Sequence, residues 1–229
     1  MTLDTITAAP AWFITGTDTD VGKTFVACAL LHALRQRGLQ AQGMKPVAAG
    51  CDAAGRNEDV EQLIAASASQ APRELVNPYA FGAAIAPHIA AADANVVIDL
   101  RSIVDACQRL RASSQALVVE GAGGFCVPLG PDCDSTDLAR ALGLPVILVV
   151  GMRLGCLNHA LLTQQAIAAS GLPLAGWIAN CIDPAMPRQE ENLRTLQQRI
   201  HAPLLAVIPY GTTPEAAARK LQLPDLIVA

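Results

Sequence analysis

Short apolar runs alternate along this chain with stretches of helical period, and this alternation constrains the fold most. The apolar runs have the length of buried strands, and Pro145, Pro173 and Pro203 stand where strands would begin. Such alternation is typical of βαβ units in a parallel sheet. We therefore predict a single α/β domain over residues 1–229, with a doubly wound, mostly parallel sheet and helices on both faces. The predicted strands lie near 11–16, 41–47, 116–120, 145–151, 174–180 and 203–208, and the predicted helices near 22–37, 57–69, 99–112, 158–170, 187–199 and 214–221.

Residues 71–98 interrupt this alternation. They are rich in alanine and proline and have no clear period, so we expect a loop-rich excursion there rather than a domain boundary. No internal repeat and no linker with a shift in composition divides the 229 residues, a common length for one α/β domain.

Composition excludes several classes of protein. With 52% hydrophobic and 16% charged residues and a formal net charge of -4, the chain is expected to fold, and no basic excess suggests a nucleic-acid partner. The longest apolar run, 144–152, falls well short of the roughly 20 residues of a membrane helix. The first residues lack the features of a signal peptide, and the seven cysteines form no C-x-x-C pair. We therefore expect no membrane association and a cytoplasmic location with reduced thiols.

The segment FITGTDTDVGKTFVAC places a glycine-containing loop between a predicted strand and a predicted helix. This is the context of a P-loop, but the standard motif has four residues before its Gly-Lys-Ser/Thr triplet, whereas five separate Gly16 from Gly22. Gly22 would let the backbone approach a phosphate, Lys23 would reach the β- and γ-phosphates, and the Thr24 hydroxyl would ligate Mg²⁺. The alternative is an ordinary turn in which Asp20 caps the helix.

Glu120 ends the predicted strand 116–120 and is followed by Gly121, Gly123 and Gly124. A carboxylate at this place is where a P-loop site needs a further Mg²⁺ contact. The glycines favour a backbone lying close to a ligand. Alternatively, Glu120 only begins a turn.

Lys45 and Asp59 are the other charged candidates. Lys45 stands near the end of the predicted strand 41–47, just before Pro46, and a lysine there would neutralise charge on a transferring phosphoryl group. A solvated loop lysine is the alternative. Asp59 stands in the first turn of a predicted helix, where it would face the metal or, like Asn57, cap the helix.

Amides and one arginine follow the remaining strands. Asn180 offers the donor and acceptor that suit an adenine edge, although an asparagine in a turn is commoner. Arg153 follows the strand 145–151. Asn158 stands at the expected start of a helix, where N-capping explains it.

Five motifs together, in their order and spacing along the chain, match the pattern of one protein family: GTDTDVGKT, KPVAAG, VEGAGG, LGCLNHALLT and IANCIDP. With them the chain resembles the dethiobiotin synthetase family from about residue 11 to 211, and the long-spaced P-loop is itself characteristic of that family. The resemblance implies a P-loop NTPase fold, a homodimer, Mg²⁺ as cofactor, ATP as cosubstrate, and 7,8-diaminononanoate with CO2 or bicarbonate as substrates. It also implies a carbamate on one amine, its phosphorylation to a mixed carbamic-phosphoric anhydride, and ring closure by the second amine.

Roles for individual residues follow from the same resemblance. Thr24, Asp59 and Glu120 correspond to Mg²⁺ ligands, and Lys45 and Lys23 to catalytic lysines. The implied nucleotide contacts are Asp20, Val21, Gly22, Lys23, Thr24, Phe25, Asp59, Glu120, Gly121, Ala122, Gly123, Asn180, Cys181, Ile208, Pro209 and Tyr210. The implied substrate contacts are Thr19, Ala49, Arg153 and, for the carboxylate tail across the dimer, Asn158.

This chain departs from the family pattern at several positions. Ala49 replaces a frequent serine that contacts substrate, and Arg153 replaces a frequent lysine, which preserves the charge but alters the donor geometry. Cys181 replaces a frequent aspartate. Glu215 is the nearest match to a glutamate that contacts the nucleotide in relatives.

Two other protein classes share this type of ATP domain. ATPase switches of cell division or plasmid partition carry a signature lysine five residues before the P-loop lysine, and that position is Asp18 here. Their basic amphipathic membrane helix is also not expected at the C-terminus. A glutamine-dependent cobyrinic acid amide synthase would need a glutaminase domain, for which 229 residues leave no room. We therefore expect neither class.

Overall fold

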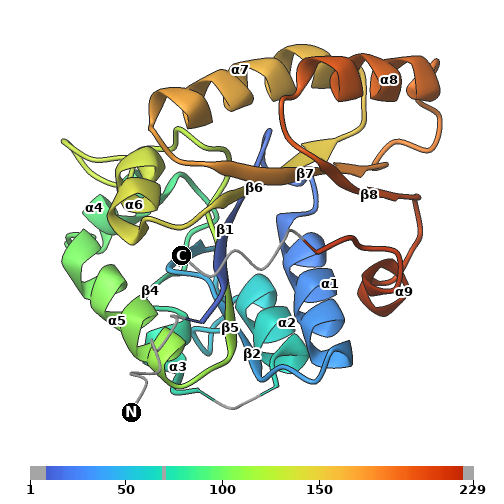
Figure 1. Ribbon diagram of the computed structural model, residues 1–229. Coiled ribbons are helices and arrows are strands. Elements are labelled where there is room, and N and C mark those ends of the chain that lie inside the picture. The colour runs from blue at the N-terminus through green and yellow to red at the C-terminus, as the bar shows by residue number, and fades with distance from the viewer. Residues whose placement is uncertain (1–8, 69–70, 224–229) are drawn as a thin grey trace.

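A six-stranded, wholly parallel sheet forms the centre of the computed structural model, which describes residues 9–68 and 71–223 (Figure 1). Its strand order is β2-β5-β1-β6-β7-β8, so successive strands are added on both sides of β1. The prediction of a doubly wound parallel α/β sheet is confirmed. The strands are β1 Ala11–Gly16, β2 Ala41–Met44, β3 Val47–Ala49, β4 Tyr79–Phe81, β5 Ala116–Glu120, β6 Val146–Gly151, β7 Leu174–Asn180 and β8 Leu204–Ile208. The helices are α1 Lys23–Gln36, α2 Glu58–Ala66, α3 Arg73–Val76, α4 Pro87–Asp93, α5 Leu100–Ala112, α6 Ser135–Leu142, α7 Cys156–Ala169, α8 Gln189–Arg199 and α9 Pro214–Ala218.

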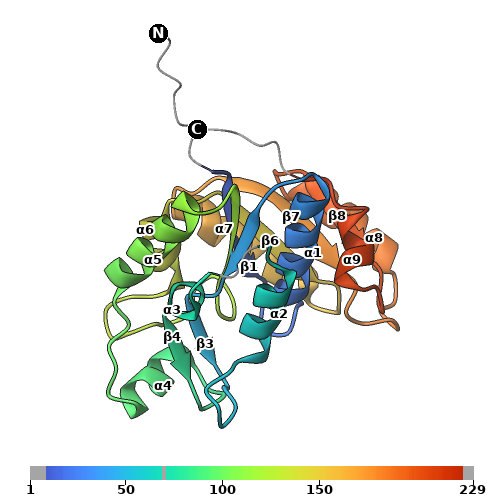
Figure 2. The same ribbon diagram turned by 90° about the horizontal axis from the view of Figure 1, so that it is seen from below.

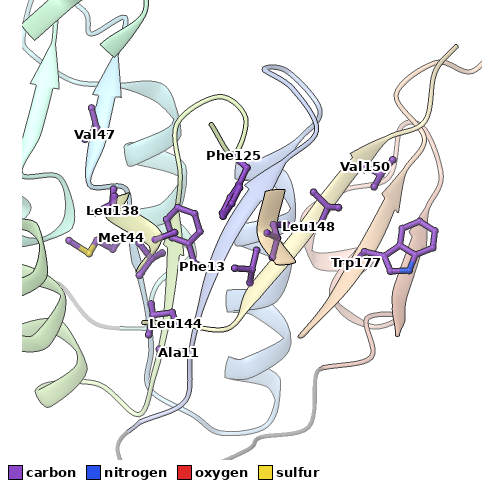
Figure 3. Packing of buried hydrophobic residues seen from close by; sticks show 14 of the residues in the cluster. Ala11, Phe13, Met44, Val47, Phe125, Leu138, Leu144, Leu148, Val150 and Trp177 are labelled. Atoms are coloured by element: carbon purple, nitrogen blue, oxygen red, sulfur yellow. The ribbon is translucent and has the colours of Figure 1, made fainter. Parts of the chain in front are cut away.

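Helices cover both faces of this sheet. Helices α1, α2 and α9 pack on one face, and α5, α6, α7 and α8 pack on the other (Figures 1 and 2). Successive side chains of a strand point to opposite faces, so Ile14 of β1 joins the first core while Phe13 joins the second. Figure 3 shows Phe13, Leu148 and Trp177 on that second face. Because both faces are buried, the strands read as nearly continuous apolar runs.

Side-chain caps fix the start of several helices. Asn57 accepts hydrogen bonds from the backbone N–H groups of Asp59 and Val60 at the start of α2. Asp134 and Asp137 form a capping box at the start of α6. Helix α6 was not among the predicted helices, although this pair of acidic residues three positions apart is its local signal.

Two sequence predictions need correction. The predicted strand 41–47 is divided, because Pro46 has no N–H to donate and the chain leaves the main sheet after Met44. The continuation, β3, pairs in parallel with β4 in a separate two-stranded sheet. Residues 71–98 are also more structured than a loop-rich excursion, since they contain α3, β4 and α4.

Some predictions fall outside the described residues. These include the signal-peptide assessment, where it depends on residues 1–8, and the predicted helix end at residue 69. Within 9–68 and 71–223, no helix combines the length and the apolar composition needed to cross a membrane.

Candidate nucleotide and substrate site

The candidate residues gather at one edge of the main sheet. All six strands run in the same direction, so their carboxyl ends lie together, where ligands bind in open α/β sheets. The loop 17–22 follows β1, Lys45 follows β2, and Glu120 is the last residue of β5. Arg153 follows β6, and Asn180 is the last residue of β7. The fold therefore brings together residues that are far apart in the sequence.

The loop between β1 and α1 leads into the N-terminus of α1, which is suited to bind phosphate. Gly22 is the N-cap of α1 with a φ of 89°, and no side chain of the described residues caps this helix. Asp20 adopts a left-handed φ of 57° and does not cap α1, so the alternative of an Asp20-capped turn is wrong. The uncapped N–H groups and the helix dipole favour an anion at this place.

Three contacts fix the conformation of this loop. The Thr17 N–H donates to the Val149 carbonyl of β6 at 3.0 Å. The Asn180 side-chain amide donates to the Val21 carbonyl at 2.9 Å. A Cβ added to Gly22 would lie only 2.2 Å from Asn180 Nδ2, so glycine is needed here both for its φ and for this close approach.

Lys45 lies at the centre of a cluster of charged and polar groups. Its Nζ donates to Glu120 Oε1 at 2.7 Å and also to Asp59 Oδ2. The Thr24 hydroxyl donates to the same Glu120 oxygen at 2.8 Å. Lys45 is buried, so the alternative of a solvated loop lysine is wrong. Asn57 caps α2, and Asp59 is therefore free to join this cluster.

Burial and neighbouring charges shift the pKa values in this cluster. Burial alone lowers the pKa of Lys45, but the carboxylates of Glu120 and Asp59 outweigh it and hold that pKa above its usual value. Burial raises the pKa of Asp59, but the Lys45 ammonium outweighs it and leaves that pKa below its usual value. For Lys23 burial dominates over the attraction of Glu120, so its pKa is lowered. Lys45 and Asp59 therefore form an ion pair at neutral pH.

The oxygen atoms of this cluster fit Mg²⁺. Thr24, Asp59 and Glu120 supply a hydroxyl and two carboxylates, and Mg²⁺ usually takes one or two carboxylates beside waters and phosphate oxygens. Glu120 Oε2 is buried and has no hydrogen-bond partner among the described residues. No group of three or more His, Cys, Asp or Glu residues in the described chain would hold a metal alone. This donor set suits a metal that arrives with a nucleotide.

The glycines after β5 pack against the first strand and its loop. The Gly121 N–H donates to the Ile14 carbonyl at 2.9 Å, and a Cβ on Gly121 would lie 2.8 Å from the Phe13 ring. Packing against Phe13 thus explains Gly121 without a ligand. Gly123 has a φ of 62°, which side chains rarely adopt.

The ends of β7 and β8 offer uncharged groups. The Cys181 N–H donates to the Ile208 carbonyl at 2.9 Å, and both residues are buried. Tyr210, just beyond Pro209, is 65% exposed. Glu215 lies in the first turn of α9 and pairs with His32 Nε2 at 3.4 Å. Of this group, Asn180 contacts the P-loop at the Val21 carbonyl, and the contacts of these residues to a base stay a prediction.

The proposed substrate residues lie on different elements: Ala49 ends β3, Arg153 follows β6 and Asn158 lies on α7. Arg153 donates to the Asp18 carboxylate, and the Ala49 carbonyl accepts a hydrogen bond from Asn57 Nδ2 at 3.0 Å. Asn158 lies inside α7, whose N-cap is Gly155, so the N-capping interpretation of Asn158 is wrong. Sequence reasoning did not identify Asp18 as a partner of Arg153, because nothing local links positions so far apart.

Comparison with known proteins adds to this geometry. A family model described as an AAA domain matches residues 11–217. The chain is 58% identical to an ATP-dependent dethiobiotin synthetase BioD of Aromatoleum aromaticum, over 96% of this chain and 100% of that protein. It is 53% identical to the protein of the same name from Xanthomonas oryzae pv. oryzae, over 94% and 98%.

Solved structures are similar in fold at low sequence identity. The signal recognition particle receptor FtsY of Elizabethkingia anophelis matches with a TM-score of 0.53 and 15% identity, over 95% of this chain and 62% of that one. The cell division protein FtsY of Thermotoga maritima matches with a TM-score of 0.51 and 15% identity, over 97% and 73%. At this identity the likeness concerns the fold alone.

Proposed function

The chain belongs to the family of ATP-dependent dethiobiotin synthetases, and we propose how its residues divide the work of that reaction. It is an ATP-dependent ligase that forms dethiobiotin in biotin biosynthesis. The observation that carries the proposal is the cluster of Lys45, Asp59, Glu120 and Thr24 beside the P-loop. A phosphate-binding loop, two buried lysines and paired carboxylates are what transfer of a phosphoryl group requires.

The substrates in this proposal are 7,8-diaminononanoate and CO2 or bicarbonate. One amine adds to CO2 and loses a proton, which gives a carbamate. A carbamate oxygen attacks the γ-phosphorus of ATP, the bond to ADP breaks, and a mixed carbamic-phosphoric anhydride forms. The second amine then attacks the carbamoyl carbon, the ring closes, and phosphate leaves.

Each group of residues has one task in these steps. The N–H groups at Gly22 and the start of α1 bind phosphate oxygens. Lys23 and Lys45 offset the negative charge around the transferring phosphoryl group, and the charged state of Lys45 is favoured by Glu120 and Asp59. Thr24, Asp59 and Glu120 would hold Mg²⁺, which when bound offsets phosphate charge and orients the triphosphate. Asn180, Cys181 and residues 208–210 would border the adenine.

We also propose that the enzyme is a homodimer, with the substrate tail bound near the interface. Leu154 is 92% exposed and Leu162 is 56% exposed, and both lie on the segment that carries Asn158. Exposed leucines beside a candidate substrate residue support an interface at this place. Sedimentation of the wild-type protein and of a Leu154→Asp variant tests this: the wild type should sediment as a dimer and the variant as a monomer.

We place the reaction in the cytoplasm. All seven cysteines are free in the structure, and four of them are buried. Reduced thiols support a reducing compartment.

The test of the reaction is phosphate release from ATP, with and without 7,8-diaminononanoate and ¹³C-bicarbonate, followed by mass spectrometry of the product. Release should depend on the diamine, and dethiobiotin should carry one ¹³C atom. The control is the same assay with a diamine whose second amine is acetylated, which prevents ring closure. Release that is indifferent to the diamine would contradict the proposal.

A further inference from the structure

Asp18 binds two cations that come from different elements of the fold. Its backbone carbonyl accepts a hydrogen bond from Lys23 Nζ at 3.0 Å. Its carboxylate Oδ2 accepts from Arg153, and Oδ1 accepts from the Thr19 N–H at 2.8 Å. Asp18 lies in the long spacing between Gly16 and Gly22, so this longer loop reaches the segment that follows β6.

The loop is also bound directly to β6, the strand that leads into this segment. The Thr17 N–H donates to the Val149 carbonyl at 3.0 Å, and the Gly151 N–H donates to Thr17 Oγ1 at 3.4 Å. A Cβ on Gly151 would lie 2.8 Å from a Val21 methyl group. The two segments are therefore held as neighbours without any help from the Asp18–Arg153 pair.

Stability does not account for this ion pair. The Arg153 side chain is 40% exposed and the Asp18 side chain is 46% exposed, and exposed pairs contribute little to folding. The pair does fix the direction of a long, flexible side chain. The guanidinium keeps further N–H donors accessible to a ligand, beside the carbonyl that binds the P-loop lysine and two residues before the N-cap of α7.

We propose that Asp18 is a positioning residue that directs the Arg153 guanidinium at the carbamate of the bound substrate. This inference rests on the proposed function. A carbamate has the planar pair of oxygens of a carboxylate, which a guanidinium binds through two parallel hydrogen bonds. The carbamate must lie in line with the γ-phosphate, and Arg153 is bound through Asp18 to the loop whose Lys23 would reach that phosphate. Asp18 acts on the reaction through Arg153 and does not touch the substrate.

A double-mutant cycle tests this role. Asp18→Asn keeps the side-chain oxygen for the Thr19 N–H and the carbonyl for Lys23, but it loses the attraction for Arg153. We expect Asp18→Asn and Arg153→Met each to lower kcat/KM for the diamine about tenfold, and the double variant to be no worse than Arg153→Met alone. The dissociation constant of ADP, measured by calorimetry, should stay within about twofold of wild type in all three.

Two matched variants complete the experiment. Arg153→Lys keeps the charge and should recover about half of the loss on a logarithmic scale. Glu190→Gln removes the exposed Arg194–Glu190 pair on α8 and should leave kcat/KM unchanged. Three outcomes would overturn the positioning role. The loss of kcat/KM in the double variant could equal the product of the two single losses, or Asp18→Asn could leave kcat/KM unchanged. The affinity for ADP could also fall as much as kcat/KM does. If wild-type phosphate release were itself indifferent to the diamine, the proposed function would fail instead.

Discussion

The carboxyl edge of the sheet has two halves with different chemistry. At the ends of β1, β2 and β5, the buried side chains are charged: Lys23, Lys45 and Glu120. At the ends of β7 and β8, the buried residues Cys181 and Ile208 are uncharged. The same edge thus has a charged half, where we propose that the phosphates bind, and a neutral half, where we propose that the base binds. Burying charges is costly unless they are paired, and the charged half meets this requirement through Lys45 and its two carboxylates.

The two halves are joined at the P-loop. Asn180, at the end of β7, holds the Val21 carbonyl of the loop that also presents Lys23 to phosphate. A change in the neutral half therefore reaches the phosphate half through one amide. The following variants separate what each half contributes.

Removing the central charge should have the largest effect. We expect Lys45→Met to lower kcat about 10³-fold, because a positioned cation no longer offsets the charge of the transferring group. ADP affinity should change less than about threefold, since phosphate binding at α1 remains. Single-turnover kinetics and ADP titration measure the two quantities, with a melting curve to establish that the variant is folded. Comparable losses of both quantities would remove the catalytic role of Lys45.

Disturbing the contact between Gly22 and Asn180, where the two halves meet, should have the next largest effect. Gly22→Ala should lower ATP affinity about 100-fold, because the new methyl group displaces Asn180 from the loop in addition to straining a φ of 89°. Gly38→Ala is the matched control, since Gly38 has a φ of 82° but, apart from its chain neighbours, no atom of the described residues lies within 4 Å of its added Cβ. Both variants should lose similar stability in urea, but only Gly22→Ala should lose affinity. Equal affinities would show that the Gly22–Asn180 contact is unimportant.

Removing the amide that joins the two halves should have a smaller effect. We expect Asn180→Ala to raise KM for ATP about tenfold and to leave kcat within about twofold, because the amide contributes to binding and not to phosphoryl transfer. Discrimination between ATP and GTP, measured as the ratio of kcat/KM values, should fall with it. If kcat/KM falls by the same factor for ATP and for GTP, the role of Asn180 is to hold the loop and not to recognise the base.

The smallest effect concerns pH, and it should distinguish the halves. The pKa of Asp59 in the folded protein lies below its usual value of 3.8, so its favourable contribution is present above that pH and is lost as pH falls through the folded pKa. Relative to Asp59→Asn, the wild type should therefore lose urea stability below about pH 4. Asn180→Ala should differ from wild type by a constant amount over the same range. A pH-independent difference for Asp59→Asn would contradict the ion pair with Lys45.

The residues of the charged half could be predicted from the sequence, but many of the contacts that fix their positions could not. Lys45 and Glu120 could be predicted from the sequence because each stands at or near the end of a predicted strand, and parallel strands bring their ends together. The partner of Arg153 could not be predicted from the sequence, since Asp18 is 135 positions away. The two residues become neighbours through the pairing of β1 with β6.

Local signals misled where tertiary structure decides. Asn158 resembles a cap, but a left-handed Gly155 with a φ of 96° starts α7 three positions earlier. The division of the strand 41–47 depends on β4, which β3 joins after Pro46, and no pattern within 41–47 reveals that partner.

The order of strands in the sheet also determines when the nucleotide loop can take shape during synthesis. β1 and its loop are made first, but β1 pairs only with β5 and β6, and Thr17 binds a carbonyl of β6. In a nascent chain, apolar β1 therefore lacks at least one of its two neighbouring strands until residue 151 has left the ribosome. Pairings between such distant segments form slowly and leave apolar surface open to aggregation. For this enzyme, the interval of synthesis between β1 and β6 is a period in which a chaperone would protect the unpaired strand.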